Sequence, residues 1–74
     1  MPRIEKFPVS VEHEGNIYTG EQIVEGTKFR YQKVVFEGRT KHDSYRYLPD
    51  QTDYMNGIAK HLLIEIVRDR DNGL

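Results

Sequence analysis

The chain contains no cysteine, only three prolines and no long apolar run. The absence of cysteine excludes a disulfide scaffold, a zinc site built from thiolates and thiol redox chemistry. No stretch approaches the ~20 apolar residues that span a bilayer, and the N-terminal stretch lacks the apolar segment of a signal peptide. We therefore expect a soluble protein of the reducing cytoplasm with no membrane partner.

Neither sign of charge is in excess, and the glycines are scattered. Charged residues make up 31% of the chain and hydrophobic residues 36%, with a net charge of −1, which is the balance of a globular protein. With 74 residues, the sequence predicts a single domain over residues 1–74, with a small core that self-association would help to stabilise. The isolated glycines form no phosphate-binding loop.

Residues 52–70 carry the strongest pattern in the chain. Their apolar residues recur at the spacing that places them on one side of an α-helix. These residues are Met55, Ile58, Ala59, Leu62, Leu63, Ile66 and Val67. Asp53 at the start and Arg68 and Arg70 at the end match the helix dipole, and Asp50 or Thr52 is the expected N-cap. The pattern predicts an amphipathic helix with one buried face.

Four segments before this helix have the pattern of β-strands: residues 6–13, 17–24, 28–36 and 39–47. Turn residues, including Gly15 and Gly38, separate them. Pro8 lacks an N–H and suits an edge position or the start of a strand. The sequence therefore predicts an α+β fold, an antiparallel meander of three or four strands with one C-terminal helix on one face, in the order ββββα.

Three features of the predicted sheet leave alternatives open. A two-residue first loop places Val9 and Val11 on the side of Tyr18 and Val24, whereas a three-residue loop places them with Ile17, Thr19 and Ile23. Gly20 indicates either a bulge or a close contact. The alternation also slips near Lys33, which is typical of a bulge or of a central strand with both faces partly covered.

One side of the predicted helix is a candidate interface: Gly57, His61, Ile64 and Arg68. Ile64 lies nearly opposite the centre of the apolar stripe, where a solvent-facing helix carries a polar residue. Gly57 is small enough to let another helix approach closely. This pattern favours a homodimer or partner contact, and the alternative is a single exposed isoleucine of the kind found on most proteins.

A second candidate site is the basic island of residues 27–47, whose net charge of +4 contrasts with −3 before it and −2 after it. Basic and aromatic residues on neighbouring strands suit phosphate contacts and base stacking. The candidate nucleic-acid contacts are Lys28, Arg30, Lys33, Arg39, Lys41, Arg46, Tyr31 and Tyr45. The alternative is a solvated edge hairpin whose charges prevent aggregation.

Catalytic and metal-binding patterns are missing from the sequence. No two histidines have the spacing of a metal site, such as i and i+4 on one helix face. His42, Asp43 and Ser44 are the residue types of a catalytic triad, but neighbours on a strand point to opposite faces. The sequence therefore predicts no enzyme, no metal and no cofactor.

Three motifs give the chain a resemblance: EGNIYT at residues 14–19, VEG at 24–26 and LLIEIVR at 62–68. They make it similar to a group of short uncharacterised bacterial proteins in which strands precede a C-terminal amphipathic helix. The resemblance implies a bacterial cytoplasmic protein and brings no activity or cofactor with it. Our interpretation is a non-enzymatic protein-interaction module that binds itself, as a homodimer, or another protein, with nucleic-acid binding through residues 28–47 as the alternative.

Overall fold

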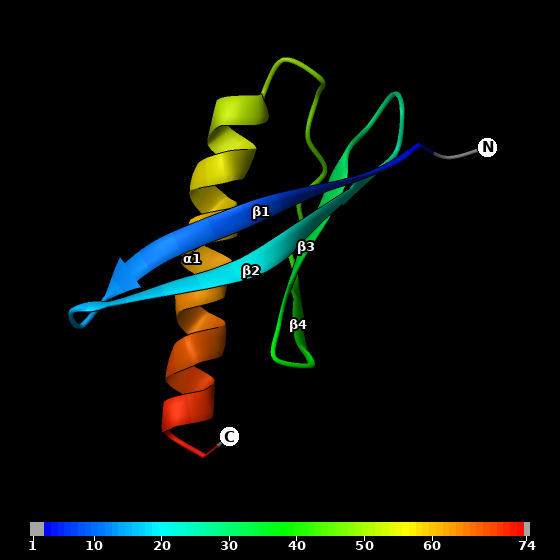
Figure 1. Cartoon of the computed structure of the whole chain (residues 1–74). Coiled ribbons are helices and arrows are strands. Elements are labelled where there is room, and N and C mark those ends of the chain that lie inside the picture. The colour runs from blue at the N-terminus through cyan, green and yellow to red at the C-terminus, as the bar shows by residue number, and fades with distance from the viewer. Residues whose placement is uncertain (1–2, 74) are drawn as a thin grey trace.

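The computed structural model describes residues 3–73. Four strands precede one helix: β1 (Ile4–His13), β2 (Asn16–Glu25), β3 (Tyr31–Phe36), β4 (Arg39–His42) and α1 (Thr52–Asp71). The strands form one antiparallel sheet in the order β1-β2-β3-β4, and α1 packs against it (Figure 1). The predicted α+β class and the ββββα order are confirmed.

The first hairpin has a two-residue loop. Glu14 and Gly15 form it with φ angles of 51° and 80°, the left-handed geometry that matches the twist of the flanking strands. Val11 therefore pairs with Tyr18, and the two side chains lie on the same face of the sheet. This register decides between the two loop alternatives, since Val9 and Val11 share the side of Tyr18 and Val24.

The β3–β4 hairpin is shorter than the sequence predicts. β3 begins at residue 31 and β4 ends at residue 42. The Asp43 N–H still donates to the Gln32 carbonyl over 3.0 Å, and residues 44–46 then leave the ladder. The pairing resumes only at Arg30 and Tyr47, whose main chains exchange two hydrogen bonds of 2.8 Å. The register of β3 runs without a bulge, with Val34 buried on the helix side and Val35 half-buried on the other. The slip near Lys33 thus reflects a central strand with both faces partly covered.

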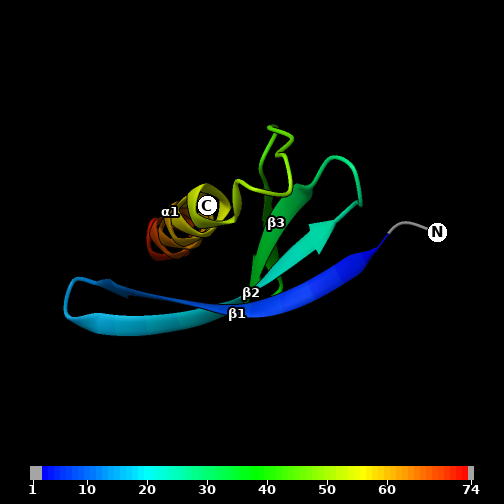
Figure 2. The ribbon, with the colours of Figure 1, turned by 90° about the horizontal axis from the view of Figure 1, so that it is seen from above.

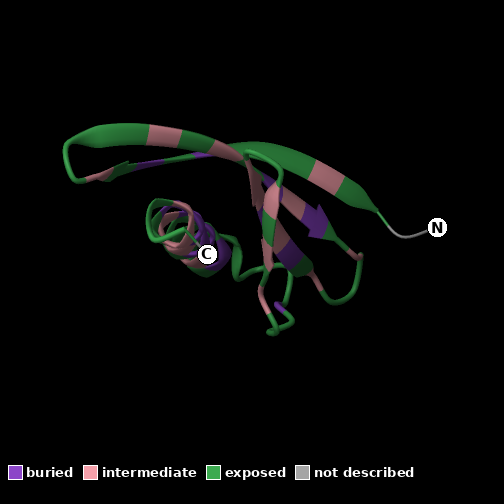
Figure 3. Ribbon diagram, turned by 90° about the horizontal axis from the view of Figure 1, so that it is seen from below, coloured by how far each residue is buried: buried purple, intermediate pink, exposed green. Residues whose placement is uncertain are grey.

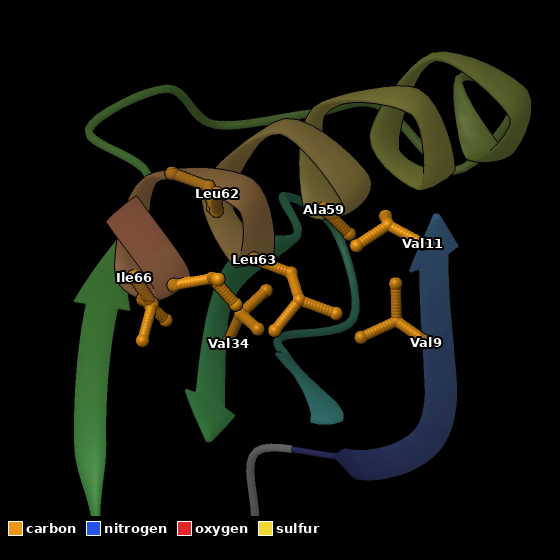
Figure 4. Packing of buried hydrophobic residues seen from close by; sticks show 8 residues of the cluster. Val9, Val11, Val34, Ala59, Leu62, Leu63 and Ile66 are labelled. Atoms are coloured by element: carbon orange, nitrogen blue, oxygen red, sulfur yellow. The ribbon is translucent and has the colours of Figure 1, made fainter. Parts of the chain in front are cut away.

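The core lies between α1 and the sheet. Of the seven apolar helix positions in the predicted stripe, six are buried and Ile58 is half-buried. All of them except Met55 pack against Val9, Val11 and Val34 (Figure 4). A second cluster near the start of the helix joins Val24, Tyr47 and Met55. The predicted buried face of the helix is confirmed.

The sheet bends around the helix, so that the β1–β2 hairpin extends past α1 (Figures 1 and 2). The tips of the β1–β2 and β3–β4 hairpins are exposed (Figure 3). Gly20 sits where the bent sheet meets the helix: a Cβ atom there would lie 2.8 Å from the Val35 carbonyl oxygen and 3.2 Å from Leu63 Cδ1. Gly20 pairs directly with Val9, so the glycine marks a close contact and not a bulge.

A chain of hydrogen bonds between polar side chains ties residues 43–47 to the sheet. Gln22 Nε2 donates to Gln32 Oε1 over 2.8 Å. Gln32 Nε2 donates in turn to Asp43 Oδ2 at 3.3 Å and to the Tyr47 hydroxyl at 3.4 Å, and that hydroxyl donates to Asp43. Within residues 3–73, no buried side-chain nitrogen or oxygen lacks a partner, so the buried glutamines are satisfied.

The N-cap of α1 is Gln51, so the prediction of Asp50 or Thr52 was wrong. Gln51 Oε1 accepts a 2.8 Å hydrogen bond from the Leu48 N–H, and the Thr52 hydroxyl donates to the Pro49 carbonyl. Both side chains thus stabilise the turn before the helix and do not cap it. Among the described residues, no helix is long and apolar enough to cross a membrane.

Candidate interaction surface

Strand β1 forms one open edge of the sheet over ten residues. The Gly26 N–H donates to the Arg3 carbonyl over 2.9 Å, which fixes the hydrogen-bonding phase of the β1–β2 ladder. Because hydrogen-bonded pairs alternate with non-bonded ones, the odd-numbered residues of β1 bond to β2. The main-chain groups of Lys6, Ser10 and Glu12 therefore point away from the sheet, where another strand can pair. Pro8 belongs to the same outward set and lacks the N–H.

A groove of about 430 Å³ runs between this edge and the helix. Its walls come from both elements and from one β2 residue: Phe7, Pro8, Val9, Ser10, Gln22, Thr52, Asn56 and Lys60. Consecutive strand residues point to opposite faces, so a groove that touches residues 7–10 follows the free edge of β1. More of its wall is apolar than polar, and Phe7 is 43% exposed. The edge and the groove together form what we call the β1–α1 surface.

Three of the four residues of the predicted helix-face interface lie on the surface. Gly57, His61 and Arg68 are exposed, and a Cβ atom on Gly57 would meet nothing within 4 Å. Ile64, however, is half-buried and packs against the core. The prediction that it projects away from the core was wrong, because the long β1–β2 hairpin extends past the helix (Figure 2) and its residue His13 lines one recess together with Ile64.

Part of the basic island faces the helix and is paired with acids. The Arg30 Nη2 atom lies 3.3 Å from Glu5 Oε1. Lys41 Nζ lies 3.2 Å from Glu65 and 3.4 Å from Asp69. The hydrogen bond to Glu65 has the largest effect and raises the pKa of Lys41 above its ordinary value. Burial, the next effect, lowers this pKa, and the other contacts with Glu65 and Asp69 raise it further. These cations are therefore partly neutralised.

The rest of the island is spread over other surfaces. Arg39 lies near Ile66 and Asp69 on the helix side. Tyr31 and Lys33 project from the opposite face of the sheet, and Lys28, Tyr45 and Arg46 lie in irregular segments. The Arg46 guanidinium lies 4.9 Å from the centre of the Phe29 ring. The eight predicted contacts therefore form no single surface, and nucleic-acid binding stays a prediction.

The histidines and carboxylates show no catalytic or metal-binding arrangement in the part of the chain that the structure describes. No three of them lie close enough to hold a metal ion. His42 is exposed on the edge strand β4. Asp43 directs a carboxylate oxygen to Gln32 and Tyr47, which leaves the triad-like residues 42–44 without a proton-relay geometry.

Comparisons with known proteins add no assignment. A scan against protein-family models, a search of curated proteins and a search of solved structures each found no match to this chain. The resemblance to a group of short bacterial proteins therefore stays a prediction, and the function has to be argued from the geometry.

Sequence reasoning missed the β1–α1 surface. It assigned Pro8 to an edge position or to the start of a strand, yet it did not connect residues 6–13 with the helix face that carries Asn56 and Lys60. The available signal was Phe7, a large apolar residue that shares the parity of Val9 in a half-buried strand. Its exposure shows only once the helix is placed over the sheet.

Proposed function

We propose that the chain is a small non-enzymatic interaction module of the cytoplasm that binds an extended protein segment along the β1–α1 surface. The observation that carries this proposal is the ten-residue open edge of β1 bordering an apolar groove. Added strands bind exposed sheet edges through main-chain hydrogen bonds, while pockets beside the edge select alternate side chains. Both parts are present on one side of this molecule.

The groove also defines the chemistry of the segment. Every second side chain of an added strand points toward the helix, and the walls of Phe7 and Val9 favour apolar groups there. Lys60 lines the opposite wall, is exposed and makes no ion pair within residues 3–73. A segment with alternating apolar residues fits best.

Peptide display tests this proposal. A library of random ten-residue peptides is selected on the immobilised chain, and the enriched peptides are measured against two variants that introduce the same residue. Asn56→Trp fills the groove, whereas His61→Trp alters the outer side of the helix. We expect Asn56→Trp to weaken binding at least tenfold and His61→Trp to leave it unchanged, with circular dichroism confirming that both variants fold.

Either of two results contradicts the proposal. Enriched peptides that bind Asn56→Trp as tightly as the wild type do not use the groove. A selection that enriches no peptide removes the extended-segment partner. Loss of binding in His61→Trp alone would move the site to the predicted interface on the helix.

A further inference from the structure

We infer that the segment bound at the β1–α1 surface is strand β1 of a second copy of this chain. The two strands pair antiparallel, with Val9 of one copy opposite Val9 of the other, and the two sheets become one. This inference rests on the proposed function, because it specifies which segment the open edge receives. The observation that supports the inference is that the charges of β1, Lys6 and Glu12, can pair with those of a second β1.

The parity of the strand restricts how two copies can pair. A two-fold axis perpendicular to the sheet keeps helix-side residues opposite helix-side residues, and outer residues opposite outer residues. Within β1, only the outward main-chain groups of the even-numbered residues are free to bond across the new contact: Ile4, Lys6, Pro8, Ser10 and Glu12. A limited set of registers satisfies both conditions.

The register centred on Val9 places opposite charges together. Lys6 of one copy lies opposite Glu12 of the other on the outer face, and the symmetry repeats this pair. Both side chains are exposed, and neither has an ion-pair partner in the described part of the chain. On the helix side, Phe7 lies opposite Val11, so an apolar side chain of the added strand enters the groove. Opposite-charge and apolar pairs directly across an antiparallel ladder are stabilising.

The neighbouring registers lose this match. Centring on Pro8 sets the two prolines opposite each other in a bonding position, where neither has an N–H to donate, and sets Lys6 opposite Ser10. Centring on Ser10 sets Glu12 opposite Pro8 and moves Lys6 opposite Glu14, which lies in the turn beyond β1, so neither charge is paired within the ladder. In the register centred on Val9, the Ser10 N–H still donates to the Pro8 carbonyl of the other copy. Proline therefore removes one donor from each such pair and selects the register.

Charge reversal tests the pairing directly. Sedimentation equilibrium from about 5 to 500 µM is run on the wild type, Lys6→Glu and Glu12→Lys. Each single reversal sets like charges across the contact twice, so we expect each to weaken the dimer at least tenfold. An equimolar mixture of the two variants restores a Lys–Glu pair at both positions and should form heterodimers of wild-type strength. The double reversal should restore the homodimer, and Glu21→Lys, an exposed reversal on β2, should change nothing.

Three results would overturn the inference: a wild type that stays monomeric up to 500 µM, single reversals that dimerise like the wild type, or a mixture that stays monomeric. A monomer that still binds the selected peptides leaves the proposed function standing and removes only the self-pairing. A dimer that ignores both reversals but is lost in His61→Trp would place the contact on the outer side of the helix.

Discussion

Two glycines with opposite surroundings give the sharpest test of the packing between sheet and helix. Gly20 lies under α1, where an added Cβ atom would be 2.8 Å from the Val35 carbonyl oxygen and 3.2 Å from Leu63 Cδ1. The end of the leucine side chain can rotate aside, but the carbonyl belongs to the β3 backbone. Gly20→Ala therefore forces a shift between β2 and β3.

The size of the effect follows from two opposing contributions. Overpacking of this kind costs about 1–3 kcal/mol, and the lower entropy of the unfolded alanine chain returns roughly 0.4–1 kcal/mol. We expect Gly20→Ala to lower the free energy of unfolding by about 1–2 kcal/mol, which lowers Tm by on the order of 5–15 °C for a domain of this size.

Gly57→Ala is the matched control. Gly57 lies within α1, and an added Cβ atom would meet nothing within 4 Å. The same substitution should there raise the free energy of unfolding by about 0.5–1 kcal/mol. Thermal and urea unfolding followed by circular dichroism at one protein concentration measures both variants. A Gly20→Ala variant as stable as the wild type would refute the close contact and the placement of α1 over Gly20.

Three further changes probe other parts of the structure. Leu63→Ala removes a fully buried side chain at the centre of the core and should cost about 2–5 kcal/mol in urea unfolding. Gln32→Leu leaves Gln22 Nε2 without its acceptor and should cost about 1–3 kcal/mol; an unchanged midpoint would show that the glutamine pair is dispensable. The pKa of Lys41 is raised above its ordinary 10.5 by Glu65, so its contribution to stability is present below that pH and is lost as the pH rises through the folded-state pKa. The wild type should therefore lose stability relative to Lys41→Met above pH 10.5, and parallel curves would contradict the ion pair.

The helix and the element order could be predicted because both are set by local patterns. The spacing of Leu62, Leu63, Ile66 and Val67 defines a buried face whatever covers it. Glu14-Gly15 also favours a tight turn, and the observed register follows from its two-residue length. In each case the sequence neighbours alone carry the information.

The limits of the β3–β4 hairpin and the position of Ile64 could not be predicted in this way. Residues 44–46 leave the ladder between Asp43 and Tyr47, whose side chains both bond to Gln32, a contact between segments distant in the sequence. Helical periodicity gives the direction of Ile64 but not the reach of the hairpin that covers it. The β1–α1 surface likewise arises from how the strand and the helix are placed in space.

Amide hydrogen exchange resolved by NMR, followed as a function of protein concentration, tests the central claim most directly. In a single copy, the N–H groups of Lys6, Ser10 and Glu12 point out of the sheet edge and should exchange fast. We expect all three to become protected as the concentration rises through the range of dimer formation, while Thr40 and His42 on the opposite edge stay fast. Exchange at Lys6, Ser10 and Glu12 that does not depend on concentration would contradict the pairing of β1 with a second copy.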